Sequence, residues 1–210
     1  MTALLGNAAA AVGGFITGVM NFFTDMFLTP PLRASLQHLE DTELKTLKGV
    51  CRSGPAFKNL TLCVCVCVCV QEAAELSSLK PQLDELGVPL FAVVKEDVGT
   101  EVQNFRPYFK GEIFLDKERR FYGPRERRLG LLGFLRVGVW MNGLRAFQKG
   151  FMGNVLGEGF VLGGVFVIGP GQQGVLLEHR EVEFGDKVST GDVIRAARRI
   201  SQEPLPLALK

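Results

Sequence analysis

The chain has 210 residues, of which 47% are hydrophobic and 22% charged. This composition suits one folded domain with an appendage, and it excludes disordered and collagen-like proteins. The net charge of +2 predicts no nucleic-acid partner, although residues 117–149 carry nine basic side chains against two acidic ones.

Residues 1–31 form a hydrophobic amino-terminal segment in which no side chain from Met1 to Thr24 is charged. It lacks the basic start of a secretory signal, and glycines and asparagines interrupt the roughly 20 apolar residues that a spanning helix needs. Three alternatives stay open: a peripheral or inserted membrane anchor, a loosely packed tail, and a cleaved signal. We expect a cytoplasmic protein, with association with a membrane surface through residues 1–31, or secretion, as the alternatives.

The next three predicted elements are a helix, a loop and a strand. Leucines at helical spacing predict an amphipathic helix over residues 32–48, and small and turn-forming residues predict a loop over 49–62. Four Cys-Val repeats then fill residues 63–70 and predict a strand, because both residue types are compact and apolar.

From residue 71 onward the chain alternates between helical and strand patterns. Pro81 predicts a kink or restart within the first of these helices, and Gly87 predicts its end. The predicted helices are 71–86, 100–109, 125–147 and 190–200, and the predicted strands are 88–95, 112–116, 165–168 and 174–178. One domain over residues 32–202, in which 49–70 is aberrant, and a tail over 203–210 complete the prediction.

The predicted helix 125–147 is basic at its start and apolar on more than one face. Such a helix is either buried or lies against lipid. We prefer the interpretation as a helix packed in the core, whose basic first residues are exposed to solvent. The alternative is an interfacial helix whose arginines lie at the level of lipid phosphates.

Residues 169–174 match the Gly-x-Gly-x-x-Gly pattern of dinucleotide sites. In such a site a helix follows the glycines, whereas here a strand pattern follows. We therefore interpret the motif as a hairpin turn and predict no cofactor. The chain has only two histidines, His38 and His179, and neither has a second ligand at metal-binding spacing, so no metal site is predicted either.

The cysteines at 63, 65, 67 and 69 alternate with valines. In one extended strand their sulfurs would line about 20 Å, which is too long for a single zinc ion. Cys69 directly precedes the predicted helix, whose positive end lowers a thiol pKa, and Cys67 can reach it only if the strand breaks. A plain β-forming run is the alternative, and a repeated TG dinucleotide in a non-exonic segment would translate to the same sequence.

Several longer blocks carry a family resemblance. They are residues 72–80, 86–96, 107–116, 121–124, 177–181 and 184–188. These blocks resemble the peroxiredoxin-like 2A family, and the resemblance covers residues 32–48 and 71–200. It implies an α/β fold of the thioredoxin-like, peroxiredoxin-like type, with a central sheet flanked by helices. It also implies a thiol-based antioxidant or redox-regulatory role, a peroxide or disulfide substrate and a thioredoxin- or glutathione-type reductant.

The resemblance further implies a Cys-x-x-Cys at the start of the first long helix, which this chain lacks. Alignment back from Glu72 places the second family cysteine on Cys69 and the first on Val66. Cys69 with Cys67 or Cys65 is therefore the candidate catalytic set, and the altered motif puts the activity in question. The competing hypotheses are a membrane-associated, non-enzymatic interaction protein and a thiol reductase like the sibling family, prostaglandin F synthase.

Overall fold

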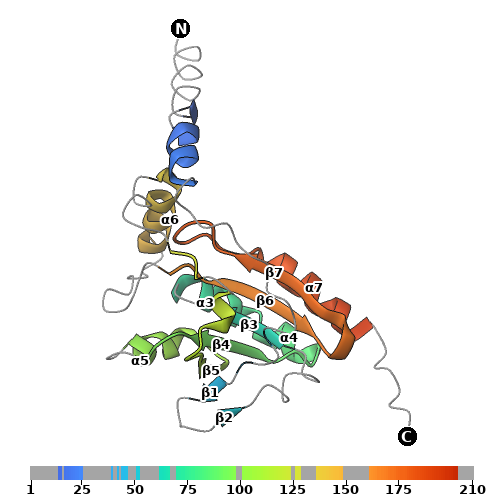
Figure 1. Ribbon diagram of the computed structural model, residues 1–210. Helices are drawn as coiled ribbons and strands as arrows, with labels where there is room; N and C mark the ends of the chain where they lie inside the picture. The colour runs from blue at the N-terminus through green and yellow to red at the C-terminus, as the bar shows by residue number, and fades with distance from the viewer. Residues whose placement is uncertain are drawn as a thin grey trace, which may run out of the picture.

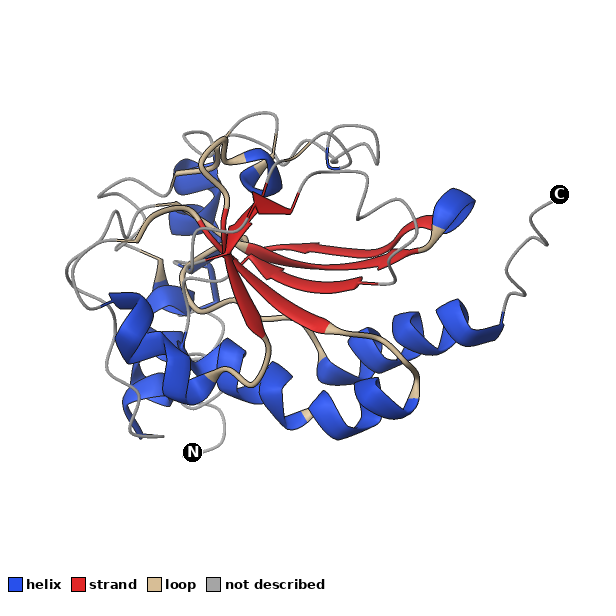
Figure 2. Ribbon diagram, turned by 90° about the horizontal axis from the view of Figure 1, so that it is seen from below, coloured by secondary structure: helices blue, strands red, loops and turns tan. Residues whose placement is uncertain are grey.

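The computed structural model describes the following residues: 14–15, 17–25, 39, 42, 44–46, 51–52, 62–66, 70–97, 101–123, 126–128, 136–148 and 161–202. Within them one seven-stranded sheet has the order β2-β1-β5-β4-β3-β6-β7. Figure 2 shows long helices gathered on one face of this sheet. The α/β arrangement predicted from the sequence is confirmed.

The strands belong to a parallel centre with antiparallel additions on both sides. They are β1 Leu44–Thr46, β2 Cys51–Arg52, β3 Leu62–Val66, β4 Leu90–Val94, β5 Glu112–Leu115, β6 Gly164–Gly169 and β7 Gly174–Arg180. Strands β3, β4 and β5 run parallel, while β6 pairs antiparallel with β3 and β7 antiparallel with β6. The hairpin β6–β7 encloses a short 3₁₀ turn, Gly171–Gln173, so the glycine-rich motif is the predicted turn and not a helix start.

The helices alternate with the parallel strands. They are α3 Val70–Ser78, α4 Lys80–Glu85, α5 Glu101–Phe105, α6 Val137–Gln148 and α7 Thr190–Gln202, with 3₁₀ turns at Arg106–Tyr108 and Arg120–Tyr122. The predicted restart at Pro81 is confirmed, because Leu79 separates α3 from α4 and the proline lies in the first turn of α4, where its missing N–H leaves no helical bond unmade. Gly87 then ends α4 at φ +69°, a conformation that glycine adopts without strain.

The cores on the two sides of the sheet follow from the alternation of side chains along its strands. Leu90 and Ala92 of β4 face α3, α4 and α7, whereas Phe91 and Val93 pack on the opposite side. On that second side Phe91 and Phe114 meet edge to face, with ring centroids 5.2 Å apart. The sheet is therefore covered on both faces, as a parallel centre requires.

The Cys-Val repeat supplies most of β3, an interior strand between β4 and β6, as its apolar composition predicts. Val64 pairs in register with Phe91 of β4 and Phe166 of β6. Cys65 pairs with Ala92 and Val165. The described strand ends at Val66, however, and Val70 already belongs to α3, so the predicted strand over 63–70 is too long.

Two predictions before this strand are wrong in part. Residues 44–46 are the strand β1 and not the end of a helix over 32–48, because they pair with β5 on one side and β2 on the other. The predicted loop over 49–62 contains strand β2, Cys51–Arg52, and ends where β3 begins at Leu62. Sheet pairing overrides the helical leucine spacing here. His38 lies outside the described residues.

The predicted helix 125–147 is also corrected. Residues 126–128 are not helical, since Arg128 forms an antiparallel bridge with Val161, and α6 begins only at Val137. Its preferred interpretation as a core-packed helix is wrong for the described residues, because Trp140 and Phe147 are 68% and 71% exposed. The predicted apolar positions before Val137 lie outside the described residues.

Residues 14–15 and 17–25 are helical and lie beside α6 at one pole of the molecule, whereas β1 and β2 lie at the other (Figure 1). Among the described residues, no helix combines the length and apolar character needed to cross a membrane.

Candidate active site at the junction of β3 and α3

The junction between β3 and α3 is where the sequence places the candidate cysteines. Cys65 belongs to β3, and Cys67 and Cys69 fall between the end of β3 at Val66 and the start of α3 at Val70. Cys67 and Cys69 lie outside the described residues. The described residues resume at Val70 in α3, so the break in the strand that would let Cys67 reach Cys69 stays a prediction.

The sheet register places an acidic residue level with this junction. Val66 pairs with Gly164, which pairs in turn with Arg180. One residue beyond that row, the Gly163 N–H donates to Glu181 Oε2 at 2.8 Å, and the Glu181 N–H donates to the Gly163 carbonyl at 3.2 Å. Glu181 is only 3% exposed, so a carboxyl is buried at the carboxyl end of the central strands.

A second buried acid, Glu72, lies in the first turn of α3. Its Oε1 accepts a hydrogen bond from the Val188 N–H at 3.1 Å, while its Oε2 is buried with no hydrogen-bond partner among the described residues. Burial raises the pKa of Glu72 to about 7, against the opposing effect of the Val188 N–H. The side chain is therefore about half protonated at neutral pH.

The two acids act on one another. Burial raises the pKa of Glu181 to about 8, and the nearby negative charge of Glu72 contributes in the same direction. The Gly163 N–H and the Arg127 guanidinium oppose this rise without cancelling it. Because each ionised form destabilises the other, the pair holds at least one proton at neutral pH.

The segment between β7 and α7 surrounds this carboxyl pair with further charged groups. Lys187 Nζ binds Glu75 Oε1 at 2.6 Å, one helical turn after Glu72. His179 Nε2 lies 3.7 Å from Asp186 Oδ2, and burial lowers the pKa of His179 against the effect of Asp186. All these groups lie at the same end of the sheet as the β3–α3 junction.

A buried arginine completes the surroundings of Glu181. Arg127 is 6% exposed, and its Nη1 donates to the Glu181 carbonyl at 2.5 Å. Its own carbonyl accepts from the Leu162 N–H at 2.9 Å, which anchors the arginine beside the start of β6. The site thus combines two buried carboxyls with raised pKa values, a guanidinium and a helix start.

Residues 75–183 of this chain match a family described as AhpC/TSA antioxidant enzyme. Peroxiredoxin-like 2A from Bos taurus is 54% identical over 204 residues, which cover 91% of this chain and 92% of the bovine protein. The chain belongs to the peroxiredoxin-like 2A family. The Gallus gallus relative is 55% identical over 205 residues, covering 92% of this chain and 90% of its own length, and the Homo sapiens relative is 52% identical over 209 residues, covering 94% and 90%.

Among solved structures, a cysteine-to-serine mutant of Xanthomonas campestris peroxiredoxin Q superposes with a TM-score of 0.50 at 15% identity. The match covers 83% of this chain and all of that chain. At this identity the likeness concerns the fold alone, and the fold of this family member is the peroxiredoxin-like α/β type that the resemblance implied. The candidate set Cys69, Cys67 and Cys65 stays a prediction.

Sequence reasoning missed Glu72, Glu181 and Arg127. The sequence held an indication that Glu72 is buried. By helical spacing it lies on the same face as Leu76 and Leu83, and an acidic residue on such an apolar face is unusual. Glu181 follows a strand and looks like any polar residue after it. Only the register of β6 and β7 shows that it is buried.

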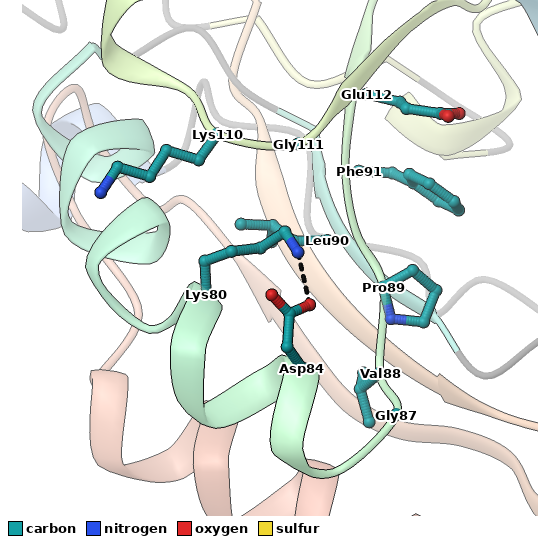
Figure 3. A pocket seen from close by; sticks show the side chains of 10 residues that line it. All are labelled: Lys80, Asp84, Gly87, Val88, Pro89, Leu90, Phe91, Lys110, Gly111 and Glu112. Carbon is teal, nitrogen blue, oxygen red and sulfur yellow. Dashed lines mark hydrogen bonds and ion pairs between the residues drawn. The ribbon is translucent and has the colours of Figure 1, made fainter.

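A separate hollow lies at the other end of the sheet. It has a volume of about 530 Å³ and is lined by Lys80, Asp84, Gly87, Val88, Pro89, Leu90, Phe91, Lys110, Gly111 and Glu112. Figure 3 shows the ion pair between Lys80 and Asp84 at its wall. Because Leu90 and Glu112 are the first residues of β4 and β5, this hollow is distinct from the β3–α3 junction.

The described residues contain no group of three or more His, Cys, Asp or Glu side chains placed to hold a metal ion.

Proposed function

We propose that this member of the peroxiredoxin-like 2A family is a thiol-dependent redox protein that reduces a peroxide, with Cys69 as the attacking thiol and Cys67 or Cys65 as its partner. The observation that supports the proposal is the buried pair Glu72 and Glu181 at the junction that holds these cysteines. Family membership supplies the antioxidant class, and this pair supplies an electrostatic setting suited to a thiolate.

The reaction proceeds in three balanced steps. The Cys69 thiolate attacks one peroxide oxygen, the O–O bond breaks, and the departing alkoxide or hydroxide takes up a proton, which leaves a sulfenic acid on Cys69. The second thiol then attacks the sulfenic sulfur, forming a disulfide and releasing water. One dithiol of the thioredoxin class, or two thiols of the glutathione class, reduces this disulfide by exchange and is oxidised to a disulfide.

The carboxyl pair contributes through its charge. A helix start stabilises a nearby thiolate because its N–H groups carry partial positive charge. An ionised carboxylate in the same turn would counteract that effect. Burial keeps Glu181 largely protonated and Glu72 about half protonated at neutral pH, so these two carboxyls oppose the field of the α3 terminus less than two ionised carboxylates would.

The test is a peroxide-consumption assay with a thioredoxin-class reductant. We expect Cys69→Ser to reduce the rate to the background level. The matched control is Cys63→Ser, which changes a cysteine of the same repeat within β3 and is expected to retain the rate. Circular dichroism of both variants shows whether the fold is intact. Equal, background-level rates for the unmodified chain and Cys69→Ser would rule out the enzymatic proposal.

Assignment of the second thiol needs a separate measurement. Mass spectrometry of the chain after one equivalent of peroxide identifies the disulfide partner of Cys69. We expect Cys67→Ser to shift the bond to Cys65 or to leave a sulfenic acid on Cys69. An oxidised chain in which Cys69 remains a free thiol would contradict the assignment.

A further inference from the structure

The described residues at one pole of the molecule carry an unusual concentration of exposed apolar side chains. Of the eleven large apolar side chains that are exposed in the described part of the chain, nine belong to α6 or to residues 14–25. They are Phe15, Val19, Phe22, Phe23, Val137, Trp140, Met141, Leu144 and Phe147. A patch of this kind marks an interaction surface, because isolated exposed residues are normal and clusters are not.

Helix α6 has two distinct faces. One face packs on the segment after β7, where Asn142 Nδ2 donates to the Phe184 carbonyl at 3.1 Å and Gly138 leaves room for the Glu183 carboxylate. The exposed apolar residues occur at helical spacing on the other side, with Trp140, Met141, Leu144 and Phe147 59–71% exposed. The helix therefore presents an apolar stripe outward while Gly138 and Asn142 face the protein.

The helical residues 14–15 and 17–25 have the same inverted arrangement. Phe15, Phe22 and Phe23 are 57–74% exposed. Thr24 is 6% exposed, and its hydroxyl donates back to the Met20 and Asn21 carbonyls. A helix that faces water shows the opposite pattern.

A buried arginine holds the two helices together. Arg136, which directly precedes α6, donates from Nη1 to Asp25 Oδ1 at 2.6 Å and to Thr24 Oγ1 at 3.2 Å. Its Nε donates to Glu183 Oε2 at 2.9 Å. Figure 1 shows the blue amino-terminal helix and α6 together at the pole farthest from β2. The two stripes thus form one surface, which we name the apolar pole and define by the nine exposed residues above.

Going beyond the proposed redox function, we propose that the apolar pole docks on the surface of a lipid bilayer that contains anionic headgroups. The two stripes hold no charged side chain, and the 24 residues that open the chain carry none either. Helix α6 holds one charged side chain, the exposed Arg145, and no acidic one, and Lys149 follows it in the sequence. An apolar face beside basic side chains is typical of helices that lie in the membrane interface.

A second copy of this chain is the competing occupant. The chemistry favours lipid because phenylalanine and tryptophan predominate at the pole, and these side chains are typical of the apolar face of helices at the boundary between headgroups and acyl chains. The like charges of Arg145 in two copies would repel one another if the pole met itself, whereas Arg145 attracts anionic headgroups.

The chain contains a built-in probe for this proposal. Trp140 is the only tryptophan, and it lies within the apolar pole. We expect vesicles of phosphatidylcholine with phosphatidylserine to shift its emission to shorter wavelength, and lipids with brominated acyl chains to quench it. Pure phosphatidylcholine vesicles are expected to bind more weakly, because they lack the attraction of anionic headgroups.

A pair of variants completes the test. Phe22→Ser combined with Phe147→Ser is expected to weaken vesicle binding by about tenfold or more, since two large apolar side chains no longer enter the lipid. The control is Tyr108→Ser, which removes an exposed aromatic side chain at the 3₁₀ turn Arg106–Tyr108, outside α6 and the amino-terminal helix, and is expected to leave binding unchanged. An emission spectrum that vesicles leave unaltered overturns the proposal. So does a shift that depends only on protein concentration and accompanies a dimer mass without vesicles. Neither outcome bears on the peroxide assay.

Discussion

The β3–α3 junction and the apolar pole are opposite departures from the usual distribution of side chains. At the junction, Glu72 and Glu181 are acids placed where apolar residues are expected, and at the pole Trp140 and Phe147 are aromatic residues placed where polar ones are expected. Both arrangements are unfavourable for folding in water alone. Regions that a fold retains despite such a cost are those where chemistry or binding is to be sought.

The two regions share one connecting segment. Residues 181–188, which follow β7, supply Glu181 and the Val188 N–H to the carboxyl pair. The same segment supplies Glu183 to Arg136 and the Phe184 carbonyl to α6. The thiol junction and the proposed membrane-facing pole therefore lie at the same end of the molecule. This arrangement suits a redox site that works close to a lipid surface.

The largest expected effect concerns the buried acids. The folded chain keeps the protons of Glu72 and Glu181 up to pH values of about 7 and 8, whereas the unfolded chain releases them near pH 4.5. The folded state then binds more protons, so the free energy of unfolding falls as pH rises from about 5 to 8. At about 1.36 kcal/mol per pKa unit, the full shifts set upper bounds of roughly 3 kcal/mol for Glu72 and roughly 5 kcal/mol for Glu181.

The double variant Glu72→Gln and Glu181→Gln tests this expectation. Urea unfolding at a series of pH values should show a nearly flat profile for the variant and a declining one for the unmodified chain. Glu85→Gln, at an exposed position of α4, serves as the control and should keep the decline. A decline that persists in the double variant would show that other groups cause it.

The next effect concerns the attachment of the amino-terminal helix. Arg136→Ala removes the buried guanidinium that binds Asp25, Thr24 and Glu183, and we expect a loss of about 2 kcal/mol in the free energy of unfolding, because Glu183 loses its partner in a largely buried setting. Residues 14–25 should become accessible to protease at lower enzyme concentration. Arg145→Ala, at an exposed position of α6, should change neither quantity. An unaltered cleavage pattern in Arg136→Ala would refute this role.

The smallest expected effect on the free energy of unfolding concerns a half-buried ion pair, in contrast to the buried contacts of Arg136. Lys187 and Glu75 form an ion pair at 2.6 Å in which each side chain is 27% exposed. Because solvent screens such a pair, Glu75→Gln should cost less than about 1 kcal/mol and leave the pH profile of stability intact. A cost equal to that of Arg136→Ala, measured by the same urea titration, would mean that this pair belongs to the buried network.

The sequence predicted the elements whose signals are local. Pro81 and Gly87 mark the restart and the end of the helical stretch, because one lacks an N–H and the other tolerates positive φ. The alternation of strand and helix after residue 71 was predicted from the spacing of apolar residues, which is also a local signal. The hairpin around 169–174 was predicted from its turn-forming residues. The Cys-Val run was correctly expected to form a strand, although the prediction carried that strand to residue 70, which belongs to α3.

Other features depend on partners that are distant in the chain. The leucines before residue 48 fit a helix by spacing, yet residues 44–46 form a strand because β5 offers them an edge to pair with. Glu72 and Glu181 are 109 positions apart and become neighbours only through the register of β3, β6 and β7. No local pattern specifies that register, because it is fixed by the packing of the whole sheet.

By itself the sequence determined the family, the order of most elements and the position of the candidate thiols before the first long helix, since these depend on residue identity and short-range preference. The tertiary structure alone decided which face of each helix is buried. The spacing of apolar residues along a helix is the same whether that face is buried in the core or exposed on the surface. In α6 the contacts of Arg136 and of the segment after β7 fix the orientation that leaves the apolar stripe exposed. The tertiary packing also buries the carboxyls of Glu72 and Glu181, and this burial raises their pKa values to about 7 and about 8.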